Sequence, residues 1–380
     1  MKESLALDVK HKIVIFGTGG QAIRDYYNLR DKYEIMWFLD NNKGNDYFMG
    51  KSIKIPNGTN IHTYFIAVCT NDNHYMEIAE QLKAYGLKEF KDFCPGGALE
   101  ERKIVLVHGN CHMAILKKYM MTSDSFRRRY YIYPMPVIHK MKQNHIDEDV
   151  LRNCDVFIHQ DIRKDNALGY QFSDDYTVPR LKKDCINIAV PNLYTFGKVF
   201  FPQMIRNTNN HQFYNDENGM FPLGDMNVDK LLENGIQNID QIIQTIEGEY
   251  YNSDFIKQRF HKYANEMLER EKYWDIKIMD YILANFKRKK LFYDFRHPCN
   301  DVIREICKGV FKLLNVDCQS IQEIDENLGR YEEPVYPCII RVLGLQWGND
   351  NLRKDGYKLT DGKMDFKEYY REYLYWSFGI

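Results

Sequence analysis

A cysteine follows a glycine and an asparagine directly after a short apolar run. The run is KIVLV at 103–107, and Gly109, Asn110 and Cys111 lead from it into a stretch with helical apolar spacing. A thiol at the start of a helix lies at the positive end of the helix dipole, which favours the thiolate. Backbone N–H groups of the same turn are placed to stabilise an oxyanion. These residues predict a cysteine nucleophile for acyl transfer.

A histidine far along the chain is the second candidate. Asp294 and His297 belong to the run DFRHP at 294–298, which follows a short apolar stretch and precedes apolar residues at helical spacing. A histidine acts as a base only in a fixed tautomer, and a carboxylate three residues earlier can accept its ring N–H. We therefore expect His297 as the base and Asp294 as its orienter, beside the thiol of Cys111.

The same residue types also have ordinary structural uses. His297 alone would serve as a helix cap, and Asp294 as a turn residue. A metal site at His108, Cys111 and His112 lacks a fourth ligand at suitable spacing, so no metal is expected. Buried free cysteine commonly packs as a small apolar residue. We expect this of Cys69, Cys154, Cys185, Cys307 and Cys338.

A glycine-rich turn near the N-terminus is typical of phosphate binding. Gly17, Gly19 and Ala22 form a Gly-x-Gly-x-x-Ala pattern after the apolar run at 12–16, and Asp40 ends the next apolar run. Such a turn brings backbone N–H groups to a phosphate, and the acidic residue meets a ribose hydroxyl. The stretch resembles the small N-terminal domains of some sugar acyltransferases. We expect a nucleotide or a nucleotide-sugar here, and a tight turn without a ligand is the alternative.

Strand and helix signals alternate along the first half of the chain. The predicted strands are at 12–16, 34–39, 64–69, 103–107, 130–137, 155–160 and 185–190. Alternation of this kind predicts an α/β fold with parallel sheets, whose sites lie at the carboxyl ends of the strands. The break at 94–97 predicts a Rossmann-like domain over 1–100 and a second α/β domain over 101–380. The second domain carries a helical insertion at about 227–289.

The end of the second domain has its own signals. Residues 290–293 predict a last short strand, and Pro298 suits the first position of a helix. The buried stripe of that helix is expected at Val302, Ile303, Ile306, Val310 and Leu313.

The order of these elements resembles the SGNH, or GDSL-like, hydrolases. In that fold a Gly-Asp-Ser turn after the first strand carries the nucleophile, and a late Asp-x-x-His-Pro segment carries the base. Residues 109–111 and 294–298 stand in those places. A further family block puts an Asn side chain in the oxyanion hole after a middle strand. The resemblance makes Gln160 the candidate donor, although the Gly-x-Asn-Asp pattern is absent.

A closer resemblance covers most of the chain after residue 103. The runs IVLVHGNCH, VFIHQDIR, NIAVPN and LFYDFRHP are similar, in order and spacing, to the WcbI-type family of capsular-polysaccharide enzymes. Members are regarded as acetyltransferases that bind coenzyme A. The resemblance implies an acetyl-CoA donor, a sugar acceptor and a role in surface-polysaccharide biosynthesis. Coenzyme A needs contacts for its phosphates, for which Gly109, Arg163 and the basic runs at 127–129 and 287–290 are candidates.

We therefore predict an O-acetyltransferase that acts on a polysaccharide sugar. Two mechanisms are open: Cys111 becomes acetylated, or His297 activates the sugar hydroxyl directly while Cys111 only lines the site. One alternative function is a cysteine-dependent esterase or deacetylase that uses water. Another is a non-catalytic nucleotide-sugar-binding subunit of a polysaccharide assembly complex.

Bulk composition limits the classes of partner and the cellular compartment that are expected. The 52 Lys and Arg residues nearly balance the 53 Asp and Glu residues, which argues against a nucleic-acid binder. Nine cysteines without paired spacing, and an N-terminus without a signal-peptide pattern, favour the reducing cytoplasm. No apolar run has membrane-spanning length. We expect small-molecule and saccharide substrates, with association with membrane polysaccharide machinery and the oligomeric state left open.

Overall fold

The structure is a computed structural model that describes residues 12–141, 145–207, 221–325, 328–329, 332–349, 352–353 and 363–380. These residues form an α/β fold with parallel sheets and many helices, as predicted. The chain divides into two compact units. The first contains Met1–Val190 and Phe311–Gln322, and the second contains Pro191–Val310 and Glu323–Ile380.

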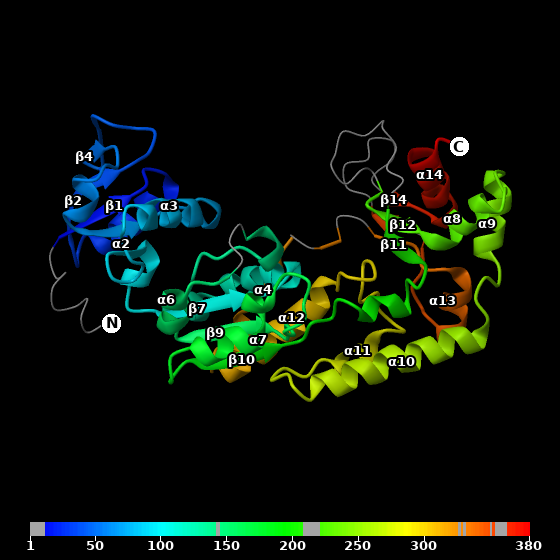
Figure 1. The fold of residues 1–380 in the computed structure, drawn as a ribbon. Coiled ribbons are helices and arrows are strands. Elements are labelled where there is room, and N and C mark those ends of the chain that lie inside the picture. The colour runs from blue at the N-terminus through cyan, green and yellow to red at the C-terminus, as the bar shows by residue number, and fades with distance from the viewer. Residues whose placement is uncertain are drawn as a thin grey trace. The chain divides into compact units, whose positions relative to one another are not determined.

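The first sheet is formed by the N-terminal part of the first unit, coloured blue in Figure 1. Its strands are β1 (Lys12–Phe16), β2 (Glu34–Leu39), β3 (Asp46–Phe48), β4 (Lys51–Lys54), β5 (Phe65–Val68) and β6 (Phe93–Pro95). They lie in the order β3-β4-β2-β1-β5-β6, and only the β3–β4 pair is antiparallel. Because β2 and β5 lie on opposite sides of β1, the strand order reverses between β1 and β5.

Two helices connect the main strands of this sheet, α2 (Gly20–Leu29) and α3 (Asp72–Ala84). The N-cap of the second helix is Asn71, whose side chain accepts a hydrogen bond from the N–H of His74. The four residues of β5 are all buried. A continuous apolar run of this kind is typical of a parallel strand that is covered on both faces.

The second sheet is wholly parallel. Its strands are β7 (Lys103–His108), β8 (Tyr130–Ile132), β9 (Val156–Gln160) and β10 (Ile186–Val190), in the order β10-β9-β7-β8. The helices of this part are α4 (Cys111–Thr122), α5 (Asp124–Arg129), α6 (Glu148–Asn153) and α7 (Asp174–Thr177). The chain reaches β8 on one side of β7 and β9 on the other, so the order reverses between β7 and β9.

The predicted domain boundary near residue 100 falls between the two sheets. The compact units nevertheless divide the chain elsewhere, and one apolar cluster contains residues from both sides of that boundary, such as Phe16 and Phe157. The buried Glu89 accepts hydrogen bonds from Tyr75 and from Tyr133, the latter at 2.6 Å. Residues before and after position 100 therefore share one core within the first unit.

The second unit is mostly helical. Its helices are α8 (Met226–Glu233), α9 (Ile239–Glu247), α10 (Ser253–Glu271), α11 (Met279–Asn285), α13 (Pro337–Leu343) and α14 (Phe366–Phe378), while α12 (Asn300–Leu313) contributes to both units. Two antiparallel pairs of short strands join β11 (Met204–Arg206) to β12 (Leu223–Asp225) and β13 (Leu352–Arg353) to β14 (Lys363–Met364). The helical stretch predicted at about 227–289 contains α8 to α11.

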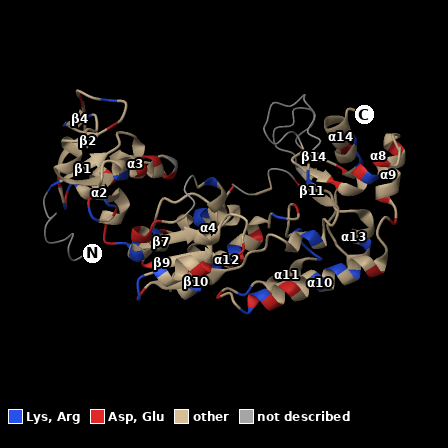
Figure 2. Cartoon of the chain, in the orientation of Figure 1, with Lys and Arg blue, Asp and Glu red and all other residues tan. Residues whose placement is uncertain are grey.

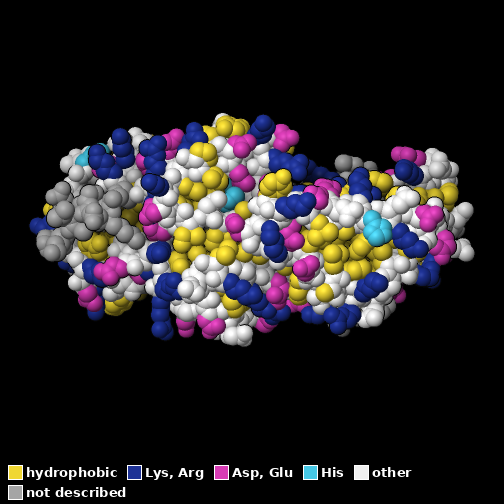
Figure 3. Space-filling view, turned by 90° about the horizontal axis from the view of Figure 1, so that it is seen from below, with side chains coloured by type: hydrophobic (Ala, Val, Ile, Leu, Met, Phe, Trp, Pro, Cys, Tyr) yellow, Lys and Arg dark blue, Asp and Glu magenta, His cyan; other side chains and the backbone are white. Residues whose placement is uncertain are grey.

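Charges of both signs are mixed over this unit. They follow one another along α10 (Figure 2), and on the face shown in Figure 3 charged side chains of both signs surround apolar patches. None of the helices in the described part of the chain is both long and apolar enough to cross a membrane.

Two predictions before α12 are wrong. Residues 290–293 form no strand, because Phe292 and Pro298 make only a single antiparallel bridge. The chain turns back on itself there, with the N–H of Tyr293 donating to the carbonyl of His297 at 2.9 Å. This turn includes Pro298, so α12 begins at Asn300 instead.

The predicted buried stripe of α12 is correct except at its last position. Val302, Ile303, Ile306 and Val310 are buried, but Leu313 is 51% exposed. Leu313 is the final residue of the helix, where the side chain reaches solvent.

Candidate active site

The turn before α4 places Cys111 at the first position of the helix. Gly109 has φ +151°, and a Cβ at this position would lie 2.6 Å from both Gln160 Oε1 and Met113 Cγ. Only glycine fits here without displacing those side chains. Asn110 is the N-cap of α4, and its side-chain oxygen accepts from the N–H of His112 at 2.9 Å.

Gln160 braces the same turn from the neighbouring strand. Its Oε1 accepts from the N–H of Asn110 at 2.9 Å, and its Nε2 donates to Nδ1 of His112 at 3.3 Å. Gln160 is buried, whereas Cys111 is half-buried and free of any disulfide. Both ends of the Gln160 amide are therefore engaged in holding the turn, and its role as an oxyanion donor stays a prediction.

The position of this turn in the sheet favours a ligand site. Cys111 follows β7, Gln160 ends β9, and these are the two strands between which the order reverses. At such a reversal the connections leave in opposite directions and open a crevice at the carboxyl ends of the strands. The arrangement presents a half-buried thiol at the first position of a helix.

The second predicted group, Asp294 and His297, lies in the second unit. His297 Nδ1 lies 2.7 Å from Asp294 Oδ2, and Asp294 Oδ1 accepts from the N–H groups of Arg296 at 2.6 Å and His297 at 3.0 Å. Asp294 is buried, and the His297 side chain is 22% exposed. The carboxylate fixes the imidazole, as the sequence predicted. Whether it acts on Cys111 stays a prediction.

Burial and hydrogen bonding oppose each other at Asp294. Burial raises the pKa of this carboxyl, but the bonds from His297 and the charge of Arg296 outweigh it and leave the pKa below its ordinary value. The ionised carboxylate is thus the form that the loop stabilises. An ionised carboxylate is suited to hold a histidine in one tautomer while the imidazole gains and loses protons.

Sequence reasoning missed the residue beneath this loop. A Cβ on Gly197 would lie 2.5 Å from the carbonyl oxygen of Asp294 and 2.6 Å from the Cα of Phe295. Gly197 lies almost a hundred residues earlier in the chain, in a 3-10 helix at Phe196–Val199. No local signal reveals this contact, because it depends on two distant segments.

Sequence reasoning also assigned no role to a histidine pair beside the Cys111 turn. His108 and His159 stand opposite each other in β7 and β9 and are both buried. His108 Nε2 donates to the carbonyl of Phe172 at 2.9 Å, and burial lowers the pKa of His108 to about 4. His159 Nδ1 lies 2.9 Å from Asp174 Oδ1. Through its hydrogen bond to Phe172, neutral His108 connects the end of β7 to the 3-10 helix at Tyr170–Phe172.

A cavity of about 620 Å³ opens where the first sheet reverses its order. Gly17, Gly19 and Asp40 line it, as the nucleotide-site prediction requires, whereas Ala22 is fully buried within α2. Gly19 is the N-cap of α2, so no N-cap side chain accepts from the first N–H groups of this helix. A Cβ built at Gly19 would have no atom within 4 Å. The backbone is therefore open to close approach by a ligand. Asp40 Oδ2 accepts from the hydroxyl of Thr18 at 2.5 Å.

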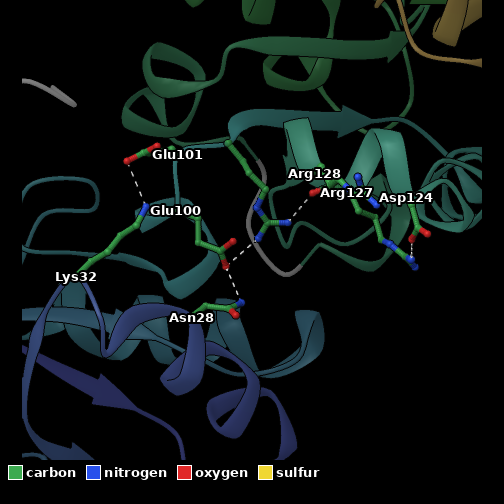
Figure 4. A pocket seen from close by; sticks show the side chains of 8 residues that line it. Asn28, Lys32, Glu100, Glu101, Asp124, Arg127 and Arg128 are labelled. Carbon is green, nitrogen blue, oxygen red and sulfur yellow. Dashed lines mark hydrogen bonds and ion pairs between the residues drawn. The ribbon is translucent and has the colours of Figure 1, made fainter.

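A second cavity, of about 580 Å³, is shown in Figure 4. Its walls are Asn28, Lys32, Glu100, Glu101, Arg102, Asp124, Arg127 and Arg128. Ion pairs join Lys32 to Glu101 at 3.2 Å and Arg102 to Glu100 at 3.0 Å, so carboxylates offset much of the positive charge. We assign no ligand to it. Arg163, another predicted phosphate contact, is exposed in the segment after β9.

Comparisons with known proteins identify relatives of two segments of the chain. A family model described as polysaccharide biosynthesis enzyme WcbI matches residues 104–319, and one described as "C2185-like, N-terminal" matches residues 9–92. No curated protein matches.

A solved structure of WcbI, described as lacking a disulfide bond between coenzyme A and one of its cysteines, is 17% identical to this chain, with a TM-score of 0.56. The alignment covers 72% of this chain and 89% of that chain, and at this identity it shows the fold alone. Because the WcbI model spans more than half of the sequence, the chain belongs to the WcbI family of polysaccharide biosynthesis enzymes.

Proposed function

We propose that this protein transfers an acetyl group from acetyl-CoA to a sugar hydroxyl during the biosynthesis of a surface polysaccharide. One observation carries the proposal. A half-buried, free thiol occupies the first position of α4, where the parallel sheet reverses its order, and Gln160 braces the turn that holds it. Membership of a polysaccharide biosynthesis family supplies the saccharide context.

In the covalent mechanism, the Cys111 thiolate attacks the thioester carbonyl of acetyl-CoA. The backbone N–H at the first position of α4 stabilises the oxyanion. Coenzyme A leaves as a thiolate and takes back from His297 the proton that Cys111 had given to it, so that His297 is neutral again. His297 then takes the proton of the sugar hydroxyl, whose oxygen attacks acetyl-Cys111 and releases the thiolate. The bond from His297 Nδ1 to Asp294 assigns this proton transfer to Nε2. In the alternative mechanism, His297 activates the hydroxyl for direct attack on acetyl-CoA.

The donor site is the second part of the proposal. The description of the solved WcbI refers to a disulfide between coenzyme A and a cysteine of that protein. We assign the corresponding contact with the thiol end of coenzyme A to Cys111, with Gly109 beside it and Arg163 toward the phosphates. The second sheet would then be SGNH-like, and the protein would act in the cytoplasm, where a thiolate stays reduced.

The test measures coenzyme A release from acetyl-CoA with and without saccharide acceptors. Cys111→Ser and His297→Ala are each expected to lower acceptor-dependent turnover by at least about 100-fold. Cys318→Ser, which changes another partly buried cysteine, is the matched control and should keep full activity. Intact-mass analysis without acceptor should find one acetyl group on Cys111. Full turnover by Cys111→Ala would contradict the covalent mechanism.

The alternative functions give different results in the same assay. An esterase would release acetate at full rate without any sugar. A binding subunit would turn over no acetyl-CoA and would keep its ligand in Cys111→Ser. If Cys111 and His297 act in one step, the double variant should be no slower than the slower single variant.

For the N-terminal cavity we propose a nucleotide or nucleotide-sugar ligand in a Rossmann-like fold. The open backbone at Gly19 would meet a phosphate, and Asp40 a ribose hydroxyl. Calorimetry with NAD, nucleotide-sugars and coenzyme A tests this. No heat of binding from any of them would refute it.

A further inference from the structure

Two cysteines meet just before a pair of neighbouring strands in the second sheet. Cys154 precedes β9, Cys185 precedes β10, and these strands are paired in parallel. Their sulfur atoms lie 3.7 Å apart, although the residues are 31 positions apart in the chain. Cys154 is buried as predicted, and Cys185 is half-buried and packs against the same apolar cluster.

We propose that Cys154 and Cys185 are a reversible redox modification site that forms an internal disulfide with a small-molecule disulfide as oxidant. A bond requires the sulfur atoms to approach from 3.7 Å to about 2.05 Å, which side-chain rotation can supply when the strands already lie side by side. Disulfides in a reducing compartment are usually transient and regulatory.

The surroundings distinguish the two thiols. The hydrogen bond from Cys154 lowers the pKa of the Cys185 thiol, and the charge of Lys182 acts in the same direction. The bond to Cys185 and burial raise the pKa of Cys154. Cys185 is also the more exposed of the two, so it is the thiol that an oxidant reaches first.

An ion pair beside the two thiols holds their segments together. Lys182 Nζ lies 2.6 Å from Asp155 Oδ1, and Asp155 Oδ2 accepts from the N–H of Ile104 at 2.6 Å. The segment that carries Cys185 is therefore tied to the strand that carries Cys154. This geometry keeps the two sulfurs together without a bond between them.

With glutathione disulfide as the oxidant, the reaction has two exchange steps. The Cys185 thiolate attacks one glutathione sulfur, forms a mixed disulfide and releases one glutathione thiolate. Cys154 then loses its proton to solvent and attacks the Cys185 sulfur, which releases the second glutathione thiolate. The protein dithiol gives up two electrons and the oxidant is reduced to two thiols.

The experiment incubates the full-length protein with glutathione disulfide, blocks free thiols with N-ethylmaleimide and maps the peptides by mass spectrometry. We expect Cys154 and Cys185 to be joined and to return to thiols after dithiothreitol. The oxidised protein should melt roughly 5 °C above the reduced one, because the bond closes a long loop in the unfolded chain. A wild-type protein that accumulates glutathione on Cys185 without the internal bond, or that melts lower when oxidised, overturns the proposal.

Variants separate the two steps. Cys154→Ser should trap glutathione on Cys185 as a stable mixed disulfide, and Cys185→Ser should leave Cys154 a thiol. Cys318→Ser is the control and should form the bond as the wild type does. Absence of glutathione from Cys185 in the Cys154→Ser variant would contradict its role as the entry thiol. These measurements read thiol state and melting alone, so they are independent of acetyl transfer.

Discussion

The polar side chains next to Cys111 use their hydrogen bonds to hold the turn. Asn110 gives its side-chain oxygen to the N–H of His112, and Gln160 gives its oxygen to the N–H of Asn110. The thiol is thus positioned by its neighbours.

The capping role of Asn110 is testable with a pair of variants. Asn110→Ala removes the acceptor and is expected to lower the free energy of unfolding by about 1 kcal/mol. Asn110→Asp keeps the acceptor, adds a charge at the favourable end of the helix dipole and should be at least as stable as the wild type. Urea denaturation followed by circular dichroism measures both. Equal losses in the two variants would contradict the capping role.

Asp294 should contribute stability that depends on pH. Its pKa is lowered in the folded state, so its contribution is fully present above the ordinary aspartate pKa and is lost as the pH falls through the folded value. Asp294→Asn is therefore expected to reduce stability most at neutral pH, by about 1–3 kcal/mol, and less below about pH 4. Denaturation curves from pH 3 to 7 check this. A loss that grows as the pH falls would refute it.

At the scale of elements, the two glycine turns differ in the space around them. A Cβ at Gly109 would overlap Gln160 and Met113, whereas a Cβ at Gly19 would meet nothing within 4 Å. Gly109→Ala is therefore expected to destabilise the protein by about 1–3 kcal/mol and to displace the Cys111 turn. Gly19→Ala is the matched control and should unfold as the wild type does. Thermal melting of both variants, together with the acetyl-CoA assay, tests the contrast.

The elements were largely predictable from the sequence where one short segment contains the whole signal. Continuous apolar runs predicted β1, β5, β7 and β9, because strands covered on both faces need no polar alternation. The strands β2 and β10 were predicted as well, although β10 lies at the sheet edge and is exposed at Ile186 and Asn187. The segment at Asp294–His297 was predicted to follow a strand and to open a helix. The sequence gives no pattern for the hydrogen bond from the N–H of Tyr293 to the His297 carbonyl, which makes this segment a turn. The contacts of Gly197 with Asp294, and of Cys185 with Cys154, likewise join distant segments.

At the scale of the whole molecule, each unit buries a carboxylate among tyrosine hydroxyls. In the first, which parallel sheets with apolar strands organise, Glu89 accepts from Tyr75 and Tyr133. In the second, the buried carboxylate is Asp225. Asp225 caps α8 through its Oδ1, and its Oδ2 accepts from Tyr370 at 2.6 Å and Tyr336 at 2.9 Å. The N–H of Asp225 itself donates to Tyr373 at 3.0 Å. These bonds tie α8 to α13 and α14, so the carboxyl group holds together segments that are far apart in the chain.

This carboxyl group should make the second unit less stable as the pH rises. Burial raises the pKa of Asp225 from 3.8 to about 6, even though its hydrogen bonds oppose the shift. Between about pH 4 and 6 the folded state therefore holds a proton that the unfolded chain has released, and stability falls as the pH rises through this window. At about 1.4 kcal/mol for each tenfold change in proton affinity, the full effect is on the order of 3 kcal/mol.

Asp225→Asn removes the titration but keeps the shape of the side chain. Its oxygen can still cap α8, and its NH₂ can donate to Tyr336 and Tyr370, whose hydroxyls turn to accept. We expect the variant to gain stability relative to the wild type as the pH rises from 4 to 7, as measured by differential scanning calorimetry. Asp240→Asn, at an exposed position of the same unit, should show no such trend. A constant difference between Asp225→Asn and the wild type across this range would mean that the carboxyl group is already ionised at pH 4, and that the tyrosine hydroxyls and N–H groups around it outweigh the cost of burying its charge.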